Sequence, residues 1–163
     1  MRCEDVTLGE CARVGLSELG KDEIYPGEMA TPAEIVALAY QYWRAAEVTV
    51  QLFTKGQPCS SSPFRLLSIH SIELYLNALL RASGEPAATV RGMQHNLARR
   101  LELIDKYGLV LRKRTRAHLA AISDSREYLS SRYAAEAEQR SQMNRLQATL
   151  NEVREKVHQR LAA

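Results

Sequence analysis

The stretch of residues 62–83 most constrains the fold, because it predicts a helix that is apolar around most of its circumference. It opens with Ser62 and Pro63, which suit the cap and the first position of a helix. Its polar residues fall on one narrow stripe, formed by His70, Glu73 and Asn77. Such a helix has to be covered on nearly every side, so we expect it at the centre of a helical bundle.

Other segments supply the covering helices. Thr31-Pro32-Ala33-Glu34 predicts a second helix start, in which the threonine hydroxyl and the glutamate carboxylate bind each other's backbone amides. Apolar spacing predicts further helices at about 96–107, at about 114–133 and from 134 onward, with a loop containing Pro86 and Gly92 before them. No stretch alternates with the period of two that strands need. We therefore expect an all-α bundle of four to five helices with a long C-terminal helix.

The last segment carries a narrow apolar seam whose members recur at intervals of three and four: Met143, Leu146, Leu150, Val153, Val157 and Leu161. The seam covers fewer than three heptads, so it is marginal as an isolated coiled coil. It can pack on its own bundle or on a dimer partner, and both alternatives remain open. The chain thus divides into an arm or linker (1–30), a bundle (31–135) and an amphipathic helix (136–163).

Charge is distributed unevenly. Residues 1–30 hold seven acids against three bases, and the whole chain is formally +3, which leaves about +7 for the remainder. The start lacks the basic and apolar runs of a signal peptide, and no apolar tract reaches the length of a membrane span. The three cysteines, Cys3, Cys11 and Cys59, lack zinc-site spacing. We expect a cytoplasmic protein with reduced thiols and no metal or cofactor.

The positive charge peaks in one short cluster, which consists of Arg112, Lys113, Arg114 and Arg116. Such a cluster can bind phosphates through Coulomb attraction and counterion release. A solvated turn between two helices explains it equally well. These four residues are candidate phosphate contacts.

Arg126 is the most unusual charge in the predicted helix 114–133, because helical spacing places it on the apolar face. A guanidinium in that position needs an anion. Glu73, in the polar stripe of the central helix, is the predicted partner. The ion pair is either structural or a means of holding Arg126 for use on a phosphate, since the guanidinium fork suits both carboxylates and phosphates.

Three patches of the sequence resemble HEPN domains, in the order and spacing of that family. The run from Leu66 to Leu80 resembles their second helix, and His95-Asn96-Leu97 followed by Leu101 looks like the opening of the third. Tyr128-Leu129-Ser130-Ser131-Arg132-Tyr133 is similar to the end of the fourth. The resemblance covers about residues 33–135.

The resemblance implies an up-and-down bundle that is frequently a homodimer. The family includes RNA-cleaving toxins, partners of nucleotidyltransferases and nucleotide-binding modules. HEPN ribonucleases place a histidine after four to six variable residues that follow an arginine. Arg126 matches the arginine, but Ser131, Arg132 and Tyr133 stand where the histidine belongs. None of these three side chains readily exchanges a proton near neutral pH.

The preferred hypothesis is a non-catalytic HEPN-like module that dimerises and binds RNA, a nucleotide or a partner protein. Its candidate binding face combines Arg126, Arg132 and Tyr133 with the stripe, since guanidinium holds phosphate and a ring stacks on a base. One alternative is a divergent ribonuclease toxin of a toxin–antitoxin pair, with a nucleotidyltransferase-type protein as partner. The other is a purely structural helical interaction protein.

Overall fold

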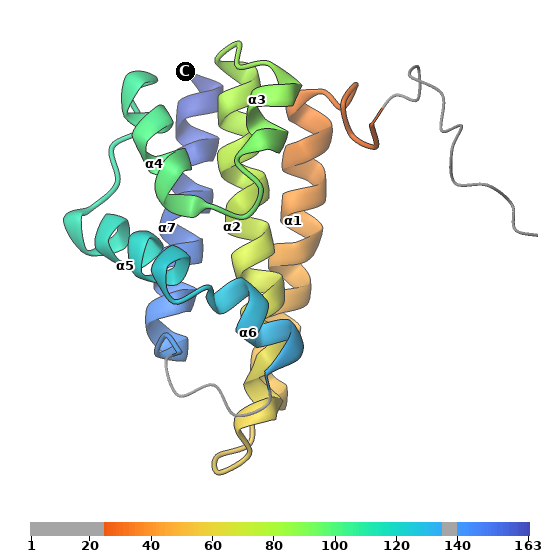
Figure 1. Ribbon diagram of the computed structural model, residues 1–163, viewed down its shortest axis with the longest axis vertical. Coiled ribbons are helices and arrows are strands. Elements are labelled where there is room, and N and C mark those ends of the chain that lie inside the picture. Colours follow the sequence, from red (N-terminus) through yellow and green to blue (C-terminus); the bar gives the residue numbers. More distant parts are fainter. Residues whose placement is uncertain (1–24, 135–139) are drawn as a thin grey trace, which may run out of the picture.

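The computed structural model describes residues 25–134 and 140–163, which form a bundle of α-helices without a strand (Figure 1). The all-α class is confirmed. Within this part of the chain, no helix is long and apolar enough to cross a membrane. The elements are α1 (Pro32–Thr49), η1 (Val50–Leu52), η2 (Pro58–Ser61), α2 (Ser62–Ala82), α3 (Ala87–Gly92), α4 (Leu97–Lys106), α5 (Lys113–Asp124), α6 (Glu127–Tyr133) and α7 (Met143–Ala162), where η marks a 3-10 helix.

Helix α2 lies at the centre of the bundle, as predicted for the apolar helix. In Figure 1 it stands between α1 and α7, with α6 crossing its lower half and α3 above. Most of its apolar side chains are almost fully buried, among them Phe64, Ile69, Ile72, Tyr75, Leu76, Leu79 and Leu80. All the larger helices therefore share one core built around α2.

The two predicted helix starts differ in outcome. At α1 the capping box is present, because Thr31 N donates to Glu34 Oε2 (2.8 Å) and Glu34 N donates to Thr31 Oγ1 (3.3 Å). At α2 the cap is Ser61 instead of Ser62, and no side chain bonds the first amides. The Ser61 hydroxyl donates to the Pro58 carbonyl instead, within the preceding 3-10 turn.

The prediction of one continuous helix over 114–133 is wrong. It is divided into α5 and α6 at Arg126, which has left-handed backbone angles (φ 50°, ψ 41°). The break changes the helical phase, so that Leu119 and Ile122 stay in the core while Tyr133 is 80% exposed. It also turns Glu127 inward, where the carboxylate meets Arg65. The segment predicted as a loop around Pro86 and Gly92 contains α3, which raises the number of helices further.

The C-terminal seam packs against α2 of the same chain. Four of its members are fully buried: Leu146, Leu150, Val153 and Val157. The helix also contacts α1, because Trp43 Nε1 donates to Asn151 Oδ1 (3.0 Å) and Arg154 lies over the Trp43 ring (4.1 Å). Of the two alternatives for the seam, the structure shows packing on its own bundle.

Candidate functional site

A groove of about 730 Å³ runs between α1, α2, α3 and the start of α4. The segment before α1 closes one side of it. This volume lies within the range of small-molecule sites, which combine apolar walls with a few polar groups. The walls here are Ile35, Leu38, Leu74, Ala87 and Val90, and the polar lining consists of His70, Glu73, Asn77, Arg81, Arg91, Gln94, His95 and Arg100.

Glu73 is the centre of the polar lining. Its Oε1 accepts from Nη2 of Arg100 (3.1 Å), and its Oε2 lies 2.9 Å from Nδ1 of His95. The Arg100 side chain is 1% exposed, and its Nε donates to Asn77 Oδ1 (2.7 Å) while Nη1 donates to the Asn96 carbonyl (3.1 Å). An ionised carboxylate only accepts hydrogen bonds, so Nδ1 of His95 is the donor in its contact with Glu73.

Local structure explains how these groups meet. His70, Glu73 and Asn77 share one face of α2, because residues three, four and seven apart are neighbours on a helix. The α3–α4 connection turns sharply at Gln94 (φ 47°). Asn96 then caps α4 by accepting from the Arg99 amide (2.9 Å), and Arg100 follows one turn later above the stripe.

The predicted pair of Glu73 with Arg126 is wrong. The carboxylate is bound by Arg100 and His95, and Arg126 is exposed at the start of α6. The sequence could have identified Arg100 as the partner of Glu73, because Arg100 lies on the apolar face that Leu97 and Ile104 define in α4. Arg126 lies on an apolar face only if residues 114–133 form one continuous helix, and they do not.

His70 lies between the groove and a smaller hollow of about 200 Å³, which is lined by Tyr42, Leu66, Leu67, His70 and Arg132. Burial lowers the pKa of His70, and the charges of Arg132 and His95 add to the effect while Glu73 opposes it. Its Nδ1 is buried with no hydrogen-bond partner among the described residues. The structure therefore favours a neutral imidazole for His70.

Within the predicted arginine-aromatic face, Arg132 lies near the stripe, because it lines the smaller hollow together with His70, whereas Tyr133 points into solvent.

Two arginines that the sequence analysis did not single out lie at the rim of the groove. Arg81 Nη1 donates to the Glu85 carbonyl (3.0 Å), and Arg91 Nη1 lies 3.3 Å from Glu28 Oε2. With Arg100, three arginines line the groove against one lining carboxylate, Glu73. The lining therefore has a formal excess of two positive charges when its histidines are neutral.

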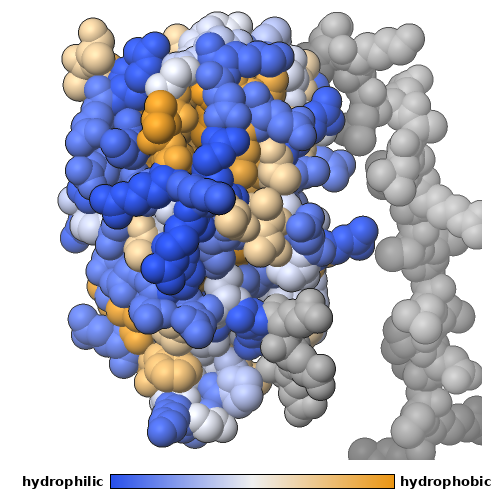
Figure 2. Space-filling model, turned by 90° about the vertical axis from the view of Figure 1, so that its left-hand side faces the viewer, coloured by the Kyte–Doolittle hydropathy of each residue, from blue (hydrophilic) through white to orange (hydrophobic). Residues whose placement is uncertain are grey.

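The basic cluster is separate from the groove, because none of its four residues lines it. It lies at the start of α5, on the side of the molecule that Figure 2 faces, where hydrophilic surface surrounds smaller apolar areas. Arg116 is held by two bonds to Asp105 (2.5 and 2.8 Å), which raise the pKa of its guanidinium. The side chain of Arg112 is 82% exposed, and Lys113 and Arg114 are exposed as well.

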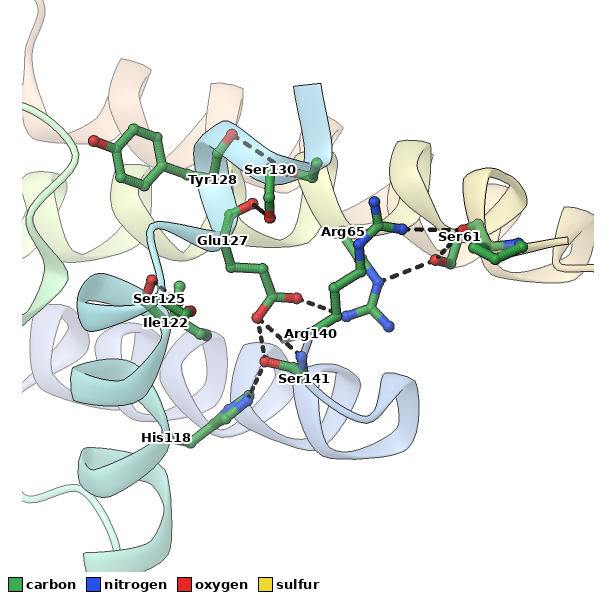
Figure 3. A network of polar contacts seen from close by, with 12 residues as sticks. Ser61, Arg65, His118, Ile122, Ser125, Glu127, Tyr128, Ser130, Arg140 and Ser141 are labelled. Carbon is green, nitrogen blue, oxygen red and sulfur yellow. Dashed lines mark hydrogen bonds and ion pairs between the residues drawn. The ribbon is translucent and has the colours of Figure 1, made fainter. Parts of the chain in front are cut away.

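A second polar network joins α2, α5, α6 and the start of α7 (Figure 3). Arg65 Nη1 donates to Glu127 Oε1 (2.6 Å), with side chains only 8% and 2% exposed. Glu127 Oε2 accepts from both the amide and the hydroxyl of Ser141. His118 bonds the Ser141 hydroxyl through Nε2 (2.7 Å) and Thr149 through Nδ1 (2.8 Å). None of these residues lines the groove or the smaller hollow.

The described residues contain no group of three or more His, Cys, Asp or Glu side chains able to hold a metal ion. Comparisons with protein-family models, with curated proteins and with solved structures gave no match. What the groove can do therefore has to be inferred from its own chemistry. It offers an apolar slot, an imidazole that Glu73 holds in place and arginines at the rim.

Proposed function

We propose that the chain is a non-catalytic, HEPN-like binding module that takes a nucleotide-type anionic ligand in the groove. The observation that carries the proposal is the lining itself, with apolar walls around a buried polar centre and an excess of arginine. Guanidinium groups bind phosphate through two parallel hydrogen bonds, and apolar walls accept a flat base.

The HEPN resemblance supports the same site, because its three patches meet at His95. The imidazole contacts Glu73 of the first patch through Nδ1. Its ring centroid lies 4.8 Å from that of Tyr128 in the third patch. Segments that are distant in sequence thus converge on one side chain at the wall of the groove.

The surroundings of Glu73 favour binding over catalysis. Both of its oxygens are occupied, and Arg100 is fixed by three acceptors, so neither side chain is available to a reacting group. Arg126, the counterpart of the ribonuclease arginine, is exposed and is followed by no histidine at the family spacing. Exposed Leu129 and Tyr133 on α6 favour a homodimer through that helix.

Titration calorimetry with ATP, GTP and a short single-stranded RNA tests the proposal. We expect saturable binding of a nucleotide that Arg91→Ala weakens about tenfold, since a charge-assisted phosphate contact is worth about 1.5–3 kcal/mol. Arg44→Ala removes an exposed arginine of α1 that does not line the groove, and should leave binding unchanged.

Two results would overturn the proposal. One is the absence of saturable binding of any nucleotide. The other is tight RNA binding that survives Arg91→Ala and is lost when Lys113 and Arg114 are both replaced by alanine. The second result would move the binding face to the basic cluster at the start of α5.

A further inference from the structure

An anionic side chain of the protein itself already occupies the rim of the groove. Glu28 lies in the segment before α1, and its carboxylate is 3.3 Å from Nη1 of Arg91. Its backbone carbonyl accepts from Nη2 of Arg81 (3.4 Å). Both rim arginines therefore bind the same residue.

A turn presents Glu28 to these arginines. The Glu28 amide donates to the Tyr25 carbonyl (2.9 Å), and the Ala30 amide donates to the Gly27 carbonyl (3.1 Å). Gly27 has φ 83°, a conformation that strains any residue with a side chain. The same turn places the Tyr25 ring against the Arg91 guanidinium, 4.6 Å from its carbon to the ring centroid. Arg91 thus meets an anion and an aromatic ring, the two groups that a nucleotide also offers.

A stronger anion can replace the Glu28 carboxylate in its contact with Arg91. The side chains of Arg91 and Glu28 are 42% and 41% exposed, and one nitrogen meets one oxygen. Exposed pairs of this type contribute little to stability. A phosphate group carries more charge and accepts two parallel bonds from a guanidinium. Nothing else in the described part of the chain bonds the Glu28 carboxylate, so its loss from Arg91 leaves no buried charge.

We propose that Glu28 is a built-in competitor for the anion subsite of the groove, and that the phosphate of a bound ligand displaces it from Arg91 and Arg81. This inference rests on the proposed binding function. It identifies the subsite that receives the phosphate. It also means that binding frees the turn of residues 25–30 from the rim, so occupancy of the groove is coupled to release of the segment before α1.

The test compares the wild-type chain with Glu28→Gln, which keeps the shape of the side chain and removes its charge. Inorganic pyrophosphate and ATP are the probes, each titrated by calorimetry. We expect Glu28→Gln to bind both about fivefold more tightly, the amount that one exposed ion pair represents. Glu102→Gln makes the same charge change at an exposed position of α4 outside the groove and should not alter the affinity.

Hydrogen exchange supplies a second measurement. Saturating pyrophosphate should speed exchange of the Glu28 and Ala30 amides in the wild-type chain, because their bonds within the turn are lost on release. Equal affinities for the wild type and Glu28→Gln, or slower exchange at these amides, would overturn this inference and leave the proposed function intact. If neither chain binds pyrophosphate or ATP, both proposals fail.

Discussion

Two buried arginine–glutamate pairs hold the bundle together, and they differ in what surrounds them. Arg65 and Glu127 are 8% and 2% exposed, and the second oxygen of the carboxylate is bound by Ser141. Arg100 and Glu73 are 1% and 11% exposed, but the second oxygen there meets His95, whose side chain is 35% exposed at the groove. The same ion pair is thus part of a closed network in one place and part of a ligand-accessible wall in the other.

The largest expected effect comes from removing each carboxylate in turn. Glu127→Ala leaves Arg65 charged in a filled interior and should lower the free energy of unfolding by about 3–5 kcal/mol. Glu73→Ala should cost only about 1–3 kcal/mol, because the space that the Glu73 side chain leaves opens to the groove and admits water beside Arg100, and the oxygens of Asn77 and Asn96 still bind the guanidinium. Urea unfolding followed by circular dichroism measures both losses.

The control for this pair is Glu102→Ala, which changes an exposed carboxylate and should alter stability by no more than about 0.5 kcal/mol. Equal losses for Glu73→Ala and Glu127→Ala would remove the distinction between an open and a closed pair.

Acidification should affect both regions through their histidines. Burial is the first cause of the lowered pKa values of His118 in the closed network and of His70 at the groove. The unfolded chain therefore binds more protons than the folded one, and the free energy of unfolding falls as the pH drops below the unfolded value of about 6.5. Each group contributes at most about 1.4 kcal/mol per pH unit in that window.

Replacing either histidine by glutamine removes its titration. We expect His118→Gln and His70→Gln each to flatten part of the dependence of stability on pH between 7.5 and 5. An unchanged slope in both variants would show that other groups control the acid response.

The smallest expected effect concerns the residue between α5 and α6. Left-handed angles cost an ordinary residue roughly 1 kcal/mol, and glycine adopts them without strain. Arg126→Gly should therefore raise the free energy of unfolding by up to about 1 kcal/mol in urea titrations. A double-mutant cycle should show no coupling between Arg126 and Glu73, and a coupling above about 0.5 kcal/mol would restore the predicted ion pair.

The features that the sequence predicted well depend on neighbours along the chain. The capping box at Thr31 involves residues three positions apart, and the helical period identifies both the buried circumference of α2 and the seam of α7. The polar stripe of α2 also followed from the period, and it does line the groove. These patterns are local, so one sequence is sufficient to read them.

The partners of the buried charges could not be obtained in the same way. Arg100 meets Glu73 across 27 positions, and Arg65 meets Glu127 across 62. Which pair forms depends on the sharp turn at Gln94 and on the left-handed residue Arg126, and neither position carries the glycine that usually marks such a conformation. Assuming a straight helix through Arg126 led to the wrong partner for Glu73.

The contact between α1 and α7 gives the molecule an optical probe of its own folding. Trp43 is the only tryptophan of the chain, and its indole bonds Asn151 and stacks under Arg154, both of them more than a hundred residues away. Closing so long a loop costs more entropy than pairing α1 with α2, so we expect α7 to dock late. Tryptophan fluorescence should therefore report the last step of assembly, after circular dichroism has recorded the helices.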